Sequence, residues 1–216
     1  MSATKIIIIS SHIPVFLVAL YALFIYDTLK PRLKIFSWFL FCSGVLQLLS
    51  LILWFMKINN LFILHLLVPL GFVFLAAYYR NVLKDFLDEA VLTVTAICFV
   101  LFSVINTLFF QDIQVFNSYA LTVECILVLI LSLSTYTLFL NKSVGQQNRQ
   151  SFSGLNWINS GLFIYHASTL LIFYFGELIT SNVSLELSRY TWVVHSFFSV
   201  IMYFCFWRGL WNRTIK

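Results

Sequence analysis

Five ionisable side chains fall inside long apolar runs of this sequence, where a charge is costly to bury. They are Glu124 and the four histidines, His12, His65, His166 and His195. An ionisable group inside hydrocarbon usually belongs to a ligand site, an ion pathway or a proton relay, unless it is paired in a hydrogen bond that fixes helix packing. These residues are therefore the first candidates for a functional site, with a structural hydrogen-bonded pair as the alternative.

The spacing of polar residues in these runs indicates where they point. Residues three and four positions apart share one face of a helix, and a polar face within a membrane bundle is expected to look inward. Two such faces are Asn159, Leu162, His166, Thr169 and Phe173, and then Trp192, His195, Ser199 and Tyr203. Another run carries Asn117 and Glu124, which are seven positions apart. Together these faces predict a polar pocket between helices.

No catalytic motif accompanies these residues. The chain has no Gly-x-Ser-x-Gly sequence, no His-Glu-x-x-His sequence and no pair of aspartates within an apolar run, so we expect no catalytic residue. Because neutral imidazoles bind metals and haem, a metal or haem site made of His12, His65, His166 and His195 is an alternative that depends wholly on helix packing. Retinal is excluded, because no lysine falls inside the last apolar run.

The runs that carry these residues are long enough to cross a membrane. Of the 216 residues, 61% are hydrophobic and 10% are charged, and the mean hydropathy is +0.95, which excludes a soluble core of this size. A bilayer core of about 30 Å needs about 20 apolar residues per helix. The segments that meet this requirement are 6–27, 34–56, 61–80, 90–110, 116–140, 155–176 and 190–210. The sequence therefore predicts an all-α integral membrane protein with a single bundle of seven transmembrane helices.

The basic residues in the connections give this bundle a direction. Of the 13 Lys and Arg residues, ten fall on one predicted side and three, Lys5, Lys57 and Arg189, on the other. By the positive-inside rule the amino terminus is outside and the carboxyl terminus is in the cytoplasm, and we expect the membrane to be the bacterial inner membrane. The net charge of +5 is then a signal of topology. The expected partner is the lipid bilayer, and no nucleic acid is expected.

This direction places most of the candidate residues in the outer half of the bundle. At 1.5 Å per residue, the depths below the outer boundary are about 6 Å for His65 and Asn106, about 8 Å for His195, about 9 Å for His12 and about 13 Å for Glu124, with His166 nearer the midplane. The predicted ligand-binding residues of an outward-facing polar pocket are His166, Glu124, His195, His65, His12, Asn159 and Asn106. Pro14 and Pro69 each free a backbone carbonyl and can kink a helix beside this pocket.

The last two apolar runs resemble a known group of proteins. The stretches Asn156–Glu177 (NWINSGLFIYHASTLLIFYFGE) and Tyr190–Trp211 (YTWVVHSFFSVIMYFCFWRGLW) are similar to the last two helices of small membrane proteins of Bacteroidota, which look like sensory modules associated with histidine kinases. The resemblance covers about a fifth of the chain and is an analogy of fold. It implies that His166 and His195 are candidates for a functional role.

We therefore predict a seven-helix membrane sensor or signalling partner without a catalytic domain. A ligand in the outward-facing polar pocket would shift helix packing, and the cytoplasmic loops, among them 143–153, would pass the signal to a separate partner such as a histidine kinase. Two alternatives stay open from the residues alone. They are a metal- or haem-binding membrane protein that uses the histidines, and a non-catalytic subunit of a membrane complex.

Overall fold

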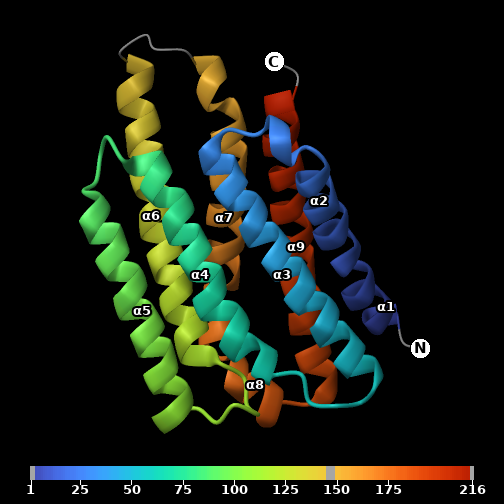
Figure 1. Ribbon diagram of the computed structural model, residues 1–216. Coiled ribbons are helices and arrows are strands. Elements are labelled where there is room, and N and C mark those ends of the chain that lie inside the picture. Colours follow the sequence, from blue (N-terminus) through green and yellow to red (C-terminus); the bar gives the residue numbers. More distant parts are fainter. Residues whose placement is uncertain (1–2, 145–148, 215–216) are drawn as a thin grey trace.

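The computed structural model describes residues 3–144 and 149–214, and the side chains of 4–141 and 153–212. Within these residues the secondary structure is helical and there is no strand (Figure 1). The elements in chain order are α1 (Ala3–Ser10), α2 (His12–Phe24), η1 (Tyr26–Thr28), α3 (Pro31–Phe55), α4 (Phe62–Leu83), α5 (Glu89–Phe109), α6 (Ser118–Val144), α7 (Arg149–Tyr174), α8 (Gly176–Ser181) and α9 (Leu185–Thr214).

Six helical segments in the described part of the chain are long and apolar enough to cross a membrane. They are Thr4–Phe24, Pro31–Phe55, Phe62–Leu83, Glu89–Phe109, Ser118–Asn141 and Leu185–Asn212. α7 has 26 residues but is not among them, because Asn156, Asn159 and His166 lower its hydropathy. The prediction of a helical membrane protein is thus confirmed, while the seventh crossing stays a prediction.

The helices run alternately up and down, so the bundle has two distinct ends (Figure 1). One end, which we call the α8 end, holds the start of α1, the connections 56–61 and 110–117, and α8. The opposite end holds the connections 25–30 and 84–88 and the carboxyl end of α9. We call it the Arg80 end, because Arg80 lies in the last turn of α4.

Six helices close into a ring. α2 packs on α3, α3 on α4, α4 on α6, α6 on α7, α7 on α9, and α9 back on α2. α5 lies outside this ring, mainly against α4, at the edge of the bundle (Figure 1). α4 and α6 are therefore neighbours in the ring although α5 separates them in sequence.

Aromatic side chains fill the ring interior toward the Arg80 end. Phe36 of α3 is fully buried, and its ring lies 4.9 Å from Phe206 of α9 and 5.2 Å from Tyr78 of α4, measured between centroids. Such contacts stabilise a bundle by dispersion and edge-to-face geometry. The large apolar side chains on the outer surface, such as Leu108 and Phe109, face the hydrocarbon expected around a membrane protein.

The first predicted helix, 6–27, is divided. α1 ends at Ser10 and α2 begins at His12, and the break lies just before Pro14, which has no N–H to donate to the Ser10 carbonyl. The Ser11 hydroxyl donates to the Ile8 carbonyl at 2.7 Å, which satisfies one acceptor at the break. Pro69 has no such effect, because α4 continues through it.

The structure also differs from the sequence prediction in the connection 177–189. This connection contains α8, and α9 begins at Leu185, five residues before the predicted start at 190. The polar sequence Glu186–Arg189 interrupts the apolar run, so hydropathy alone placed the boundary too late.

Candidate functional site

Glu124 is a buried carboxyl group that forms no hydrogen bond with the described residues. It lies on α6, and its side chain is 8% exposed. A Cβ atom added to Gly71 of α4 would lie 3.8 Å from Glu124 Oε1, an ordinary contact, so α4 passes close to the carboxyl group. Burying an unpaired polar group in an apolar interior costs free energy, so the presence of this carboxyl group calls for an explanation.

His166 presents an unused acceptor. It lies on α7, and its Nδ1 is 2.8 Å from the carbonyl oxygen of Leu162. Because a carbonyl can only accept, Nδ1 carries the hydrogen, and Nε2 of the neutral ring is an acceptor. No described residue donates to this Nε2.

His195 of α9 is held by Tyr165 of α7. The Tyr165 hydroxyl lies 2.8 Å from His195 Nε2, and the imidazole ring is also 5.6 Å from the rings of Phe173 and Trp192. Tyr165 is within electrostatic range of Glu124. The pair therefore links α7 to α9.

His12 of α2 joins the same interior. Its ring interacts with the side chain of Gln47 of α3, whose Nε2 donates to the Tyr203 hydroxyl of α9 at 3.3 Å. His12 is also within electrostatic range of His195, and its Nδ1 is buried with no partner among the described residues. Three helices thus meet through polar side chains at this place.

We call these seven residues the interior polar site. They are His12, Gln47, Glu124, Tyr165, His166, His195 and Tyr203, and they come from α2, α3, α6, α7 and α9. The α7 face predicted to look inward is confirmed, because all five of its members are at most 6% exposed. The predicted α9 face is only partly buried: Tyr203 is 1% exposed, and the other three members are half-buried.

His65 lies outside the interior polar site. Its Nε2 donates to the Val115 carbonyl at 3.1 Å, because that oxygen can only accept, and its Nδ1 is 2.8 Å from the Thr107 hydroxyl. Both ring nitrogens are therefore used in fixing α4 to α5 and to the connection 110–117. The prediction that His65 lines a ligand pocket is not supported by this geometry.

Asn106 belongs to a hydrogen-bond network at the α8 end. Its Nδ2 donates to Gln111 Oε1 at 3.0 Å and to Asn117 Oδ1 at 2.9 Å. Gln111 in turn donates to Glu177 Oε2 at 2.7 Å, and the backbone N–H of Glu177 donates to the Ser118 hydroxyl. This network ties α5, α6 and α8 together, so it gives Asn106 a structural role.

Asn159 is part of a buried clasp between three helices. Its Oδ1 accepts from the Tyr79 hydroxyl of α4 at 3.0 Å, and its Nδ2 donates to the Ser132 carbonyl of α6 at 3.1 Å. The Tyr79 and Ser132 hydroxyl oxygens are 2.8 Å apart. We call these three residues the Tyr79 clasp. Because they are fully buried and use their polar atoms on one another, Asn159 is not available to a ligand.

Replacing Tyr79 by phenylalanine is expected to lower the free energy of unfolding by about 1 kcal/mol, because Asn159 Oδ1 loses its donor inside the bundle. The measurement is the mole fraction of SDS at which the purified protein loses half of its helical circular dichroism. Tyr174→Phe is the matched control, since the Tyr174 side chain is 58% exposed. Equal midpoints for the two variants would contradict the role of the Tyr79 clasp.

The four histidines do not gather at one place. Among the residues that the structure describes, no three His, Cys, Asp or Glu side chains lie close enough together to hold a metal ion. His65 contacts Thr107 of α5 and the connection 110–117, and the Nε2 of His195 is already used by Tyr165. The expected convergence of imidazoles, on which the metal or haem alternative depends, is therefore not found in this part of the chain.

Gln47, Tyr79 and Tyr165 were missed by sequence reasoning. Gln47 is a lone amide in the middle of an apolar run, which is the same signal that identified Glu124. The two tyrosines carry no comparable signal, because an aromatic ring is common in membrane helices and only packing shows that the hydroxyl is buried.

Comparison of the chain with protein-family models, curated proteins and solved structures finds no match. The resemblance of 156–177 and 190–211 to kinase-associated membrane modules therefore stays a prediction. What the interior polar site does has to be inferred from its own geometry.

Proposed function

We propose that this chain is a seven-helix sensor or signalling partner of the bacterial inner membrane, in which the interior polar site binds a small ligand. The observation that carries this proposal is the buried Glu124 carboxyl group, which has no partner among the described residues. Glu124 and the Nε2 of His166 both accept hydrogen bonds. The ligand class that suits them is a small molecule with several donors, such as a protonated amine.

The proposal includes α7 as the seventh span. A helix of 26 residues is about 39 Å long, which exceeds the thickness of a bilayer core. Its polar residues Asn159, His166 and Thr169 are buried, whereas Leu171 is 68% exposed. α7 packs between α6 and α9, and both of these meet the criteria for a membrane span. Such a helix is stable in a bilayer because its polar face is turned to the bundle.

The proposed orientation has the amino terminus outside and the carboxyl terminus in the cytoplasm. Arg80, Lys84 and Arg208 lie toward the Arg80 end, and the positive-inside rule assigns a basic end to the cytoplasm. The interior polar site then lies on the outer side of the aromatic core formed by Phe36, Tyr78 and Phe206. A ligand would reach it from the α8 end.

The signal would travel through helix packing. Glu124 is on α6 and His166 is on α7, so a ligand held by both would favour one arrangement of these two helices. They are joined through residues 145–148, which lie outside the described residues, as does most of the loop 143–153 that is predicted to pass the signal on. The proposed receiver is a separate protein such as a histidine kinase.

Native mass spectrometry of protein purified in a mild detergent tests the proposal. A small molecule should stay bound to the wild type, and its occupancy should fall about tenfold or more in Glu124→Gln and His166→Ala, because each loses a charge-assisted or directed contact. Glu186→Gln is the matched control, because Glu186 is exposed at the start of α9.

Other outcomes of this experiment would replace the proposal. A metal or haem lost on changing His166 or His195 would identify a cofactor protein. A membrane protein that co-purifies in a fixed ratio, with no small molecule, would identify a subunit of a complex. A ligand retained equally by wild type and Glu124→Gln would rule out the interior polar site as its binding place.

A further inference from the structure

A groove runs along the outside of the bundle between α4 and α5. Its volume is about 370 Å³, and its walls include Val73, Ala76 and Ala77 of α4 and Ala96 and Leu101 of α5. The hollow exists because alanines face each other where the two helices pass, and their short side chains leave the space unfilled. Since α5 lies outside the ring, the groove opens to the surroundings of the bundle and not to its interior.

The surface of the groove is almost wholly apolar, and a charged residue, Arg80, lies at one of its ends. Val73 and Leu101, toward the middle of the helices, are 39% and 56% exposed, so hydrocarbon can reach the groove from the side. At the Arg80 end the lining changes to Arg80 and Thr93. From Arg80 to Val73 is seven residues, or about 10 Å along the helix, which is most of one leaflet of a 30 Å bilayer core.

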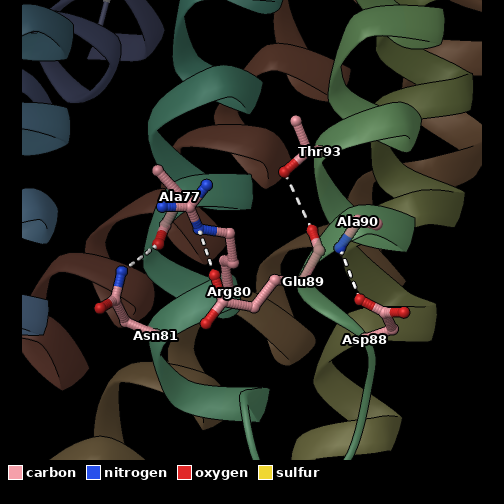
Figure 2. A network of polar contacts seen from close by, with 7 residues as sticks. All are labelled: Ala77, Arg80, Asn81, Asp88, Glu89, Ala90 and Thr93. Carbon is pink, nitrogen blue, oxygen red and sulfur yellow. Dashed lines mark hydrogen bonds and ion pairs between the residues drawn. The ribbon is translucent and has the colours of Figure 1, made fainter.

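Two oppositely charged side chains lie at the Arg80 end of the groove (Figure 2). Arg80 Nε is 3.6 Å from Glu89 Oε2, and the two side chains are 46% and 60% exposed. This distance is longer than a hydrogen bond, so the pair is loose and both groups keep capacity for other partners. The Asp88 carboxylate is engaged differently, because it caps α5 by accepting from the Ala90 N–H at 2.9 Å.

We propose that the α4–α5 groove is a binding site for one phosphatidylethanolamine molecule, whose acyl chain lies in the groove and whose headgroup contacts both members of the Arg80–Glu89 pair. The guanidinium group offers a fork of donors that suits the phosphate, and the Glu89 carboxylate suits the primary ammonium group. A neighbouring cation and anion complement a zwitterion. They do not favour a headgroup that carries only negative charge.

The test compares three phospholipids with the same acyl chains: phosphatidylethanolamine, phosphatidylcholine and phosphatidylglycerol. Each is titrated into delipidated full-length protein, and the affinity of the first bound lipid is measured by native mass spectrometry. Phosphatidylethanolamine is expected to bind about threefold or more tightly than the others, because choline has no N–H to donate and glycerol has no positive charge. Equal affinities for the three lipids would overturn the proposal.

Variants separate the headgroup site from the groove. Glu89→Gln should abolish the preference for phosphatidylethanolamine, and Arg80→Gln should lower the affinity of all three lipids. Both side chains are exposed, so neither change threatens folding. Ala96→Leu should fill the groove and lower every affinity about tenfold. The matched control is Val94→Leu, which enlarges a 57% exposed side chain of α5 that is not in the groove wall.

An unchanged preference in Glu89→Gln would overturn the headgroup assignment. Unchanged affinities in Ala96→Leu would overturn the groove. Neither result bears on the interior polar site.

Discussion

Leucine in place of Gly209 is expected to prevent stable packing of α9 on α7. A Cβ atom added to Gly209 would lie 2.6 Å from Ile158 Cγ1 and 2.7 Å from the backbone oxygen of Gly154. The second atom belongs to the α7 backbone, so it cannot turn away, and the helices would have to separate. Alanine alone should lower the free energy of unfolding by about 1–3 kcal/mol, the usual cost of overpacking, and leucine should cost more.

The effect should appear as a lower SDS midpoint in unfolding followed by circular dichroism, or as loss of the monodisperse protein during purification. Gly44→Ala is the matched control, because its added Cβ would be 3.4 Å from Ala19 Cβ, an ordinary contact. Gly161→Ala should resemble Gly209→Ala, since its Cβ would be 2.8 Å from Cys205 Cβ. A Gly209→Leu protein as stable as wild type would show that α7 and α9 do not pack as described.

Small residues at this contact explain why α7 and α9 approach so closely. In a membrane there is no hydrophobic driving force between helices, so association depends on close van der Waals packing and on interhelical hydrogen bonds. Gly161 and Gly209 allow that approach, and the Tyr165–His195 hydrogen bond crosses the same interface. The geometry of the interior polar site therefore depends on these glycines.

The sequence was sufficient to predict that the chain is helical and membrane-embedded, because long apolar runs have few other stable forms. It was less informative about short elements. α8 has six residues, which is too short for a periodic signal, and its position depends on the hydrogen bond from the Glu177 N–H to Ser118. The break at Ser11 has a local cause in Pro14, whereas Pro69 has the same chemistry without a break.

The candidate site was predicted in part. A lone carboxyl group or imidazole in an apolar run is visible in the sequence, and so is the inward face of α7. What the sequence does not contain is the order of helices around the ring. α5 lies outside it and α4 meets α6, so His65 and Asn106 bond to the connection at the α8 end instead of facing Glu124.

Methionine in place of Glu124 is expected to raise the free energy of unfolding by about 1–3 kcal/mol, while it abolishes ligand retention. The reason is that Glu124 forms no hydrogen bond with the described residues, so its replacement breaks no hydrogen bond. The replacement also removes the free-energy cost of burying a polar group. Methionine is chosen because it is unbranched, of similar length and adapts to an irregular space. The measurement is again the SDS midpoint, on protein freed of ligand by dialysis.

The sign of this change distinguishes a functional residue from a structural one. Asn159→Leu is the matched control of opposite sign, because Asn159 is also buried but its amide oxygen and nitrogen both form hydrogen bonds in the Tyr79 clasp. It should destabilise the protein, since the Tyr79 hydroxyl would lose the acceptor on Asn159 and the Ser132 carbonyl would lose the donor. If Glu124→Met destabilised the bundle as Asn159→Leu does, Glu124 would be a packing residue. If Glu124→Met stabilises the bundle as expected, the carboxyl group weakens the fold, and a ligand that it binds is the best explanation for its position there.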